Sequence, residues 1–106
     1  MNTQIYCDIA DYKIIKKYSK YKIVKGFTTN PSLMRKAGAK NYEMYSKKIL
    51  KLTKKPVSLE VFADHSKEIL DQAYKLKSFG KNVFVKIPVI TSKKKFTGDV
   101  IRKLNL

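Results

Sequence analysis

The chain has 106 residues, of which 24 are Lys or Arg and 8 are Asp or Glu, giving a formal net charge of +16. The length and the 43% hydrophobic content predict one folded domain, residues 1–106, rather than a disordered chain. Because the sequence contains no long apolar run, no secretory signal and only one Cys and one His, we expect a cytoplasmic protein without a membrane span, a disulfide framework or a metal site.

Short stretches of strand propensity alternate along the chain with stretches of helical periodicity. In chain order, the pattern predicts a strand at 4–9, a helix at 11–18, a strand at 22–28, a helical turn at 31–34 and a helix at 41–52. Pro56 ends this last helix. A strand at 57–62, a helix from 64 or 66 to 79, a strand at 82–87 and a helix at 97–104 follow. The alternation predicts an α/β fold of βαβ units around a parallel sheet.

The helix predicted at 41–52 is the clearest amphipathic one. Its apolar residues fall at helical spacing opposite a lysine-rich face, and they are Tyr42, Tyr45, Ile49 and Leu52. We interpret the tyrosines as packing between helix and sheet rather than as a platform for nucleic-acid bases. Only Arg35 and Arg102 of the 24 basic residues are arginines, and the lysines are spread along the chain. Since base readout favours Arg, we expect no nucleic-acid partner.

A polar side chain stands at or just after the carboxyl end of each predicted strand. Successive side chains of a strand face opposite ways, which places Asp8, Asn30, Glu60 and Lys86 on one face of the sheet. Charges in buried strands are costly unless they are paired, and parallel α/β folds place their chemistry at this end of the strands. The pattern therefore predicts a functional site. The alternative is an ion cluster of Asp8, Glu60 and Lys86 that only supports the fold.

The predicted site offers an amine, two carboxylates and an amide. A lysine whose charged form is disfavoured by desolvation can attack a carbonyl as the neutral amine and form a Schiff base. A carboxylate within reach, directly or through a water, can then move protons. Thr28 and Thr29 lie next to this set, although β-branched residues are also common in strands for structural reasons alone.

Several of these segments resemble the transaldolase family. Residues 26–34 read GFTTNPSLM, which is similar to the family signature at the end of the second barrel strand. Residues 85–88, VKIP, resemble the segment that carries the family's Schiff-base lysine. Residues 7–10, CDIA, and 57–61 are similar to the first and third strands of the family. The resemblance covers the whole chain in order.

The resemblance implies a (β/α)8 barrel of the TIM type, of which this chain supplies about the first four βα units. It implies a transaldolase of the pentose phosphate pathway, which passes a dihydroxyacetone unit between sugar phosphates and needs no cofactor because the imine is the electron sink. Lys86 would attack the ketose carbonyl, Asp8 would handle the proton of the hydroxyl whose loss drives carbon–carbon cleavage, and Glu60 would act through a water. The implied substrate-binding residues are Asn30, Thr28 and Thr29.

Fructose-6-phosphate aldolases, a sister group, share the fold and the lysine but typically carry Gln where this chain has Glu60. The Glu favours a transaldolase, and a lyase of the sister type is the alternative. A (β/α)8 barrel takes about 200–250 residues, and the family's phosphate-binding Arg residues have no counterpart here. We therefore expect weak or no activity from the chain alone, and association with itself or with a missing C-terminal half. A catalytically inactive half-barrel and a basic polyanion-binding module are the remaining alternatives.

Overall fold

The structure, a computed structural model, describes residues 3–105. One parallel sheet of four strands organises this part of the chain. The strands lie side by side in chain order and are β1 (Ile5–Asp8), β2 (Val24–Thr28), β3 (Val57–Glu60) and β4 (Val83–Lys86). All three pairings between neighbours are parallel, so the α/β fold and the parallel sheet predicted from the sequence are confirmed. β1 and β4 form the two edges of the sheet.

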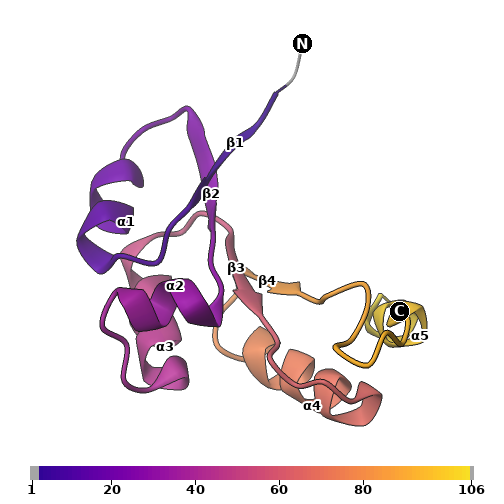
Figure 1. The fold of residues 1–106 in the computed structure, drawn as a ribbon. Coiled ribbons are helices and arrows are strands. Elements are labelled where there is room, and N and C mark those ends of the chain that lie inside the picture. Colours follow the sequence, from indigo (N-terminus) through magenta and orange to yellow (C-terminus); the bar gives the residue numbers. More distant parts are fainter. Residues whose placement is uncertain (1–2, 106) are drawn as a thin grey trace.

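Helices follow each strand of this sheet. They are α1 (Tyr12–Tyr18), α2 (Pro31–Lys36), α3 (Tyr42–Leu52), α4 (Ser66–Lys77) and α5 (Gly98–Leu104). Figure 1 shows α1 to the left of the strands and α2, α3 and α4 below them, whereas the upper right side of the sheet carries no helix. Side chains on that open side are exposed, with Tyr6 at 44% and Phe84 at 60%. Among residues 3–105, no helix has the length and apolarity needed to cross a membrane.

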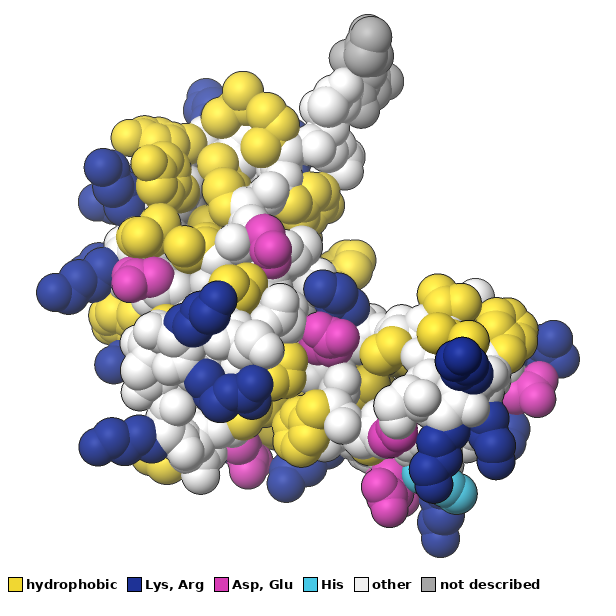
Figure 2. All heavy atoms as spheres, viewed as in Figure 1, with side chains coloured by type: hydrophobic (Ala, Val, Ile, Leu, Met, Phe, Trp, Pro, Cys, Tyr) yellow, Lys and Arg dark blue, Asp and Glu magenta, His cyan; other side chains and the backbone are white. Residues whose placement is uncertain are grey.

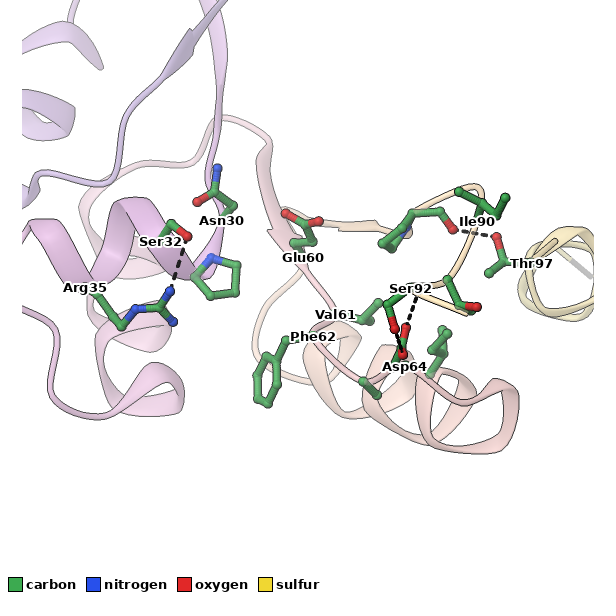
Figure 3. A pocket seen from close by; sticks show the side chains of 15 residues that line it. Asn30, Ser32, Arg35, Glu60, Val61, Phe62, Asp64, Ile90, Ser92 and Thr97 are labelled. Atoms are coloured by element: carbon green, nitrogen blue, oxygen red, sulfur yellow. Dashed lines mark hydrogen bonds between the residues drawn. The ribbon is translucent and has the colours of Figure 1, made fainter. Parts of the chain in front are cut away.

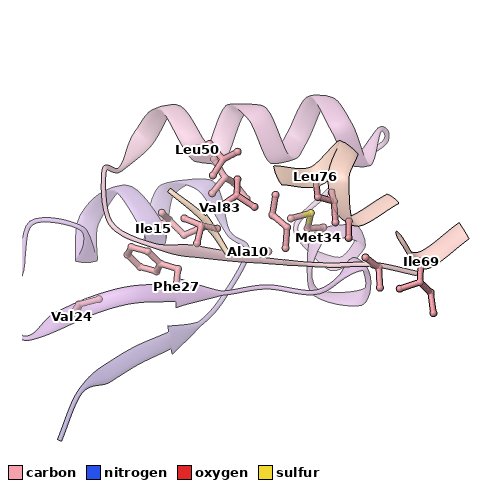
Figure 4. Packing of buried hydrophobic residues seen from close by; sticks show 14 of the residues in the cluster. Ala10, Ile15, Val24, Phe27, Met34, Leu50, Ile69, Leu76 and Val83 are labelled. Carbon is pink, nitrogen blue, oxygen red and sulfur yellow. The ribbon is translucent and has the colours of Figure 1, made fainter. Parts of the chain in front are cut away.

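The helix-covered face of the sheet holds the hydrophobic core. Phe27, Val57 and Val83 are register partners across β2, β3 and β4, and all three are buried. Figure 4 shows side chains of the helices gathered in the same cluster, among them Ile15, Met34, Leu50, Ile69 and Leu76. Burying a side chain of this size stabilises the fold by about 1.5–3 kcal/mol. Because residues alternate along a strand, burial of Phe27 and Leu59 turns Thr28 and Glu60 toward the open face.

Two helices differ in detail from the sequence prediction. The helical turn predicted at 31–34 begins at Pro31 as expected, where the Oδ1 of Asn30 accepts a hydrogen bond from the amide of Leu33 at 2.8 Å, but it continues to Lys36 as helix α2. The sequence predicted Asp64 or Ser66 as the cap of α4, and this prediction is wrong. His65 occupies the N-cap position and its side chain makes no cap hydrogen bond.

The segment after β4, expected to be a loop, has an internal structure of its own. Ile90 and Phe96 form an antiparallel bridge that folds the segment back on itself. At its end the hydroxyl of the buried Thr97 donates to the carbonyl oxygens of Pro88 and Val89 at 2.5 and 2.9 Å. These contacts fix the internal shape of the segment that follows β4.

Basic side chains are scattered over the surface in view. Figure 2 shows separate dark blue Lys and Arg side chains along the left, lower and right parts of the visible face, with a few acidic side chains between them. On this face they do not gather into a single basic surface. This distribution resembles that of solvated charges spread over helices more than a dedicated polyanion surface.

Candidate active site

Lys86 and Glu60 form a pair at the carboxyl ends of two neighbouring strands. They are register partners on β4 and β3, and the Nζ of Lys86 lies 3.8 Å from the Oε2 of Glu60. The two side chains are 47% and 24% exposed, so a ligand on the open face can reach both. The structure thus brings the predicted nucleophile and one predicted carboxylate together, next to open space.

Asp8 and Thr28 form a second pair on the same face. They are register partners on β1 and β2, and the Oγ1 of Thr28 donates a hydrogen bond to the Oδ1 of Asp8 at 2.8 Å. Within residues 3–105, no ion pair joins Asp8 to Lys86. The single ion cluster considered from the sequence is therefore two separate pairs in the structure.

The register of the sheet gives the position of one pair relative to the other. Thr28 pairs with Ser58, and Glu60 lies two residues further along β3. Asp8, the partner of Thr28, is therefore displaced by two residues along the strand direction from the Glu60–Lys86 pair. Averaged over the two steps from β1 to β3, this displacement is one residue for each strand.

Asn30 combines a structural contact with a place at the site. Its Oδ1 is used as the cap of α2, so its amide NH2 group is turned away from the helix and is free to donate to a ligand. Among residues 3–105, no hydrogen bond from this NH2 group is formed. Asn30 and Glu60 both line a groove of about 470 Å³ at the carboxyl ends of the strands.

The groove has three walls. One is the start of α2, with Ser32 and Arg35, and the others are the segments that follow β3 and β4, as Figure 3 shows. Asp64 joins the last two walls, because its carboxylate accepts hydrogen bonds from the amide of Ser92, at 2.8 Å, and from the Ser92 hydroxyl. These hydrogen bonds from Ser92 hold the pKa of Asp64 below its ordinary value. The groove therefore has a fixed rim on the side of β3 and β4.

Thr29 does not belong to this site, contrary to the prediction. Its side chain is fully buried, and its Oγ1 donates to the carbonyl oxygen of Ser58 at 2.7 Å. Its amide donates to the same oxygen at 3.2 Å, so Thr29 ties the end of β2 to β3. The physical reason is alternation along the strand: when Thr28 faces the open side, its neighbour faces the other side. We therefore remove Thr29 from the substrate-binding set.

Two tyrosines near the site have contacts that the sequence did not reveal. The hydroxyl of Tyr42 donates to the carbonyl oxygen of Glu60 at 2.9 Å, and that of Tyr45 donates to the carbonyl oxygen of Ala10 at 2.7 Å. Burial raises the pKa of Tyr42 to about 12 and also raises the pKa of Tyr45. Their interpretation as packing residues is incomplete, because both also hold backbone at the ends of β3 and β1. The sequence predicted only that both tyrosines lie on the sheet-facing side of the helix, not which groups their hydroxyls contact.

Residues 3–105 contain no group of three or more His, Cys, Asp or Glu side chains placed to bind a metal ion. The chemistry that the site itself offers is that of one primary amine, two carboxylates, a hydroxyl and an amide. An amine beside a carboxylate can add to a carbonyl and exchange protons with it. Of the predicted site residues, Asn30 and Glu60 line the groove, whereas Lys86, Asp8 and Thr28 do not, and its volume lies in the range of small-molecule pockets.

Comparison with known proteins agrees with these features. A family described as transaldolase/fructose-6-phosphate aldolase matches residues 5–105. Proteins named "Probable transaldolase" from Thermoplasma volcanium, Methanococcus vannielii and Nitrosopumilus maritimus are 39%, 37% and 37% identical to this chain over 88, 86 and 86 residues. Each of these matches covers 81% of this chain, but only 40%, 40% and 38% of the relative. The chain thus spans about two fifths of the length of these relatives.

Proposed function

Because the chain belongs to the transaldolase/fructose-6-phosphate aldolase family, we propose that it contributes the Schiff-base lysine of a transaldolase acting on sugar phosphates. The observation that carries the proposal is the Lys86–Glu60 pair, an amine 3.8 Å from a carboxylate at adjacent strand ends. The reaction would be the transfer of a dihydroxyacetone unit from a ketose phosphate to an aldose phosphate in the cytoplasmic pentose phosphate pathway.

We propose further that the sheet is part of a (β/α)8 barrel. In an eight-stranded barrel of shear 8, positions at one level advance by one residue for each strand. Asp8 on β1 and Glu60 on β3 differ by two residues over two strands, so they would lie at the same level of such a barrel. The length of the relatives, about 2.5 times that of the matched part, supports further βα units.

In the proposed mechanism, the neutral amine of Lys86 attacks the ketose carbonyl carbon. Glu60, through a water, provides the proton with which the hydroxyl of the resulting carbinolamine leaves, giving the imine and one water. Asp8 then takes the proton of the hydroxyl next to the scissile bond while that bond breaks and its electron pair moves into the imine. The released aldehyde leaves an enamine, which adds to the acceptor aldehyde as Asp8 returns the proton. Hydrolysis of the new imine frees Lys86.

The remaining polar groups would bind the substrate. The free NH2 group of Asn30 would donate to a hydroxyl of the dihydroxyacetone unit, since its oxygen is already occupied by the cap of α2. Thr28 would act through Asp8, whose carboxylate it holds by the 2.8 Å hydrogen bond. Glu60 favours transfer over the simple aldol cleavage of the fructose-6-phosphate aldolases, which remains the second candidate because the matched family includes both activities.

The open face of the sheet needs a cover in the working enzyme. Tyr6 and Phe84 expose apolar rings there, and the edge strands β1 and β4 have unpaired backbone groups. We propose that further strands of the barrel, or a second copy of this chain, cover the face and complete the site.

Chemical trapping tests the proposed nucleophile. The complete protein is incubated with fructose 6-phosphate and sodium borohydride, which reduces an imine to a stable secondary amine that mass spectrometry can locate. We expect the adduct on Lys86, no adduct in Lys86→Met, and a normal adduct in Lys103→Met, which removes an ammonium group of α5. An adduct that maps to another lysine, or that persists in Lys86→Met, would show that the assignment is wrong.

A further inference from the structure

Two tyrosine hydroxyls on α3 reach the chain at the ends of the two strands that carry the carboxylates. Tyr42 donates to the carbonyl oxygen of Glu60, the last residue of β3, and Tyr45 donates to that of Ala10, two residues beyond Asp8. The distances, 2.9 and 2.7 Å, are those of well-formed O–H···O hydrogen bonds. One helix therefore contacts both strand ends.

The two carbonyl groups need these donors because they lie where the strand pairing ends. Ala10 is buried, and a buried carbonyl without a partner is costly. A phenylalanine in place of either tyrosine would fill nearly the same space without a hydroxyl. Packing alone therefore does not account for two tyrosines at these positions.

The donors stay protonated under all conditions in which an enzyme of sugar phosphates works. Burial raises the pKa of Tyr42 to about 12, and burial also raises the pKa of Tyr45. Since a phenol below its pKa carries its proton, both hydroxyls remain donors at neutral pH and well above it. Deprotonation of the tyrosines therefore does not break either hydrogen bond at neutral pH.

α3 is a firm support for both contacts. Its N-cap residue, Asn41, accepts a hydrogen bond from the amide of Met44 at 2.9 Å, and its buried face includes Ser46 and Ile49. Its tyrosines are one helical turn apart, so they project from the same side of the helix. A displacement at one strand end would have to move the helix or break a hydrogen bond.

We propose that Tyr42 and Tyr45 are positioning residues, each assigned to a different carboxylate. Tyr42 fixes the backbone that carries Glu60 beside Lys86, and Tyr45 fixes the chain where it leaves β1 after Asp8. The proposal rests on the proposed function, in which Glu60 serves imine formation and Asp8 serves carbon–carbon cleavage. It therefore predicts that the two hydroxyls affect different steps of one reaction.

Single-turnover kinetics of the complete protein with fructose 6-phosphate separates these steps. Borohydride quenching measures imine formation, and release of the aldehyde measures cleavage. A misplacement of about 1 Å can lower a rate by up to 100-fold, and for a partial displacement we expect ~10-fold. Tyr42→Phe should slow imine formation by this factor, whereas Tyr45→Phe should leave imine formation intact and slow aldehyde release.

Tyr74→Phe is the matched control, because Tyr74 is exposed and its hydroxyl makes no hydrogen bond within residues 3–105. If Tyr42→Phe and Tyr45→Phe slow both steps equally, or behave like the control, the tyrosines only stabilise the fold and the proposal is overturned. If the unmodified protein traps no adduct, the proposed function fails instead. Carbon NMR of the side-chain carboxyls then decides the positioning alone: Tyr42→Phe should shift only Glu60, and Tyr45→Phe only Asp8.

Discussion

Two adjacent threonines provide a test of which face of β2 carries the chemistry. Thr28 donates to Asp8 at 2.8 Å on the open face, whereas Thr29 is fully buried and donates to the carbonyl oxygen of Ser58 at 2.7 Å. Replacing either one by Val keeps the shape of the side chain and removes only the hydroxyl. We expect Thr28→Val to lower activity with little effect on stability, and Thr29→Val to lower stability with little effect on activity.

The sizes of the two effects follow from the two hydrogen bonds. A hydrogen bond to a charged group contributes about 1.5–3 kcal/mol, and because Asp8 is solvent-exposed we take the low end. A difference of about 1.4 kcal/mol corresponds to ~10-fold in rate, which is the expected loss in aldehyde release for Thr28→Val. The Thr29 bond joins neutral groups, so its loss is about 1 kcal/mol. The carbonyl of Ser58 keeps the amide of Thr29 as a partner, which limits this loss.

The assays are aldehyde release in a single turnover and thermal unfolding followed by circular dichroism, both on the complete protein. For a protein of 150–250 residues, about 1 kcal/mol corresponds to a fall in Tm of about 2–4 °C, expected for Thr29→Val alone. If Thr29→Val lost activity at normal stability while Thr28→Val kept both, the assignment of the two faces of β2 would be reversed and our account of the site would be refuted.

Four further predictions concern the same groove and sheet. Glu60→Gln should shift the reaction from transfer toward simple aldol cleavage, and Asp8→Asn should slow cleavage ~100-fold or more. If product assays showed equal and small losses for both variants, these carboxylates would only support the fold. Asn30→Asp should preserve α2 and the Tm, because Asp caps as well as Asn, but raise KM for the ketose by removing the NH2 donor. Because the pKa of Asp64 is lowered, its hydrogen bonds from Ser92 are fully present above the ordinary pKa of an Asp carboxyl and are lost as the pH falls through the lowered pKa. The amide resonance of Ser92 should therefore stay unchanged from pH 7 to about 4 and shift only at lower pH. The isolated 106-residue chain should associate or aggregate and turn over sugar phosphates poorly, and a monomer in light scattering that also showed ordinary turnover in a transaldolase assay would contradict the need for a cover.

The pairing of Lys86 with Glu60 was predictable from the sequence because it depends on local periodicity. Alternation along β3 and β4 fixes which residues share a face, and the parallel order of the strands brings their ends together. The same alternation, applied strictly, would have excluded Thr29, since it places neighbours on opposite faces. The resemblance of the signature as a whole drew both threonines into the set, although only Thr28 faces the open side of the sheet.

Contacts between distant segments were not predictable in this way. The hydroxyls of Tyr42 and Tyr45 reach carbonyls 18 and 35 residues away, and Asp64 reaches Ser92 across 28 residues. No periodicity encodes such distances, because they depend on how α3 and the segment after β4 pack on the sheet. Gly26 is a similar case: a Cβ there would lie 2.6 Å from the carbonyl oxygen of Pro56, so the approach of β2 to β3 requires glycine.

Asn30 shows how a local structural requirement can determine the chemistry that a site presents. An amide has one acceptor oxygen and one donor NH2 group, and the cap of α2 uses the oxygen at 2.8 Å from the amide of Leu33. The side chain cannot turn over without losing this bond, so only the NH2 group is left to donate to a ligand at the groove that Asn30 and Glu60 both line. The helix cap therefore makes Asn30 a donor of fixed orientation. A fixed donor suits hydroxyl and carbonyl oxygens of a sugar, which are the groups that a ketose would present to this end of the sheet.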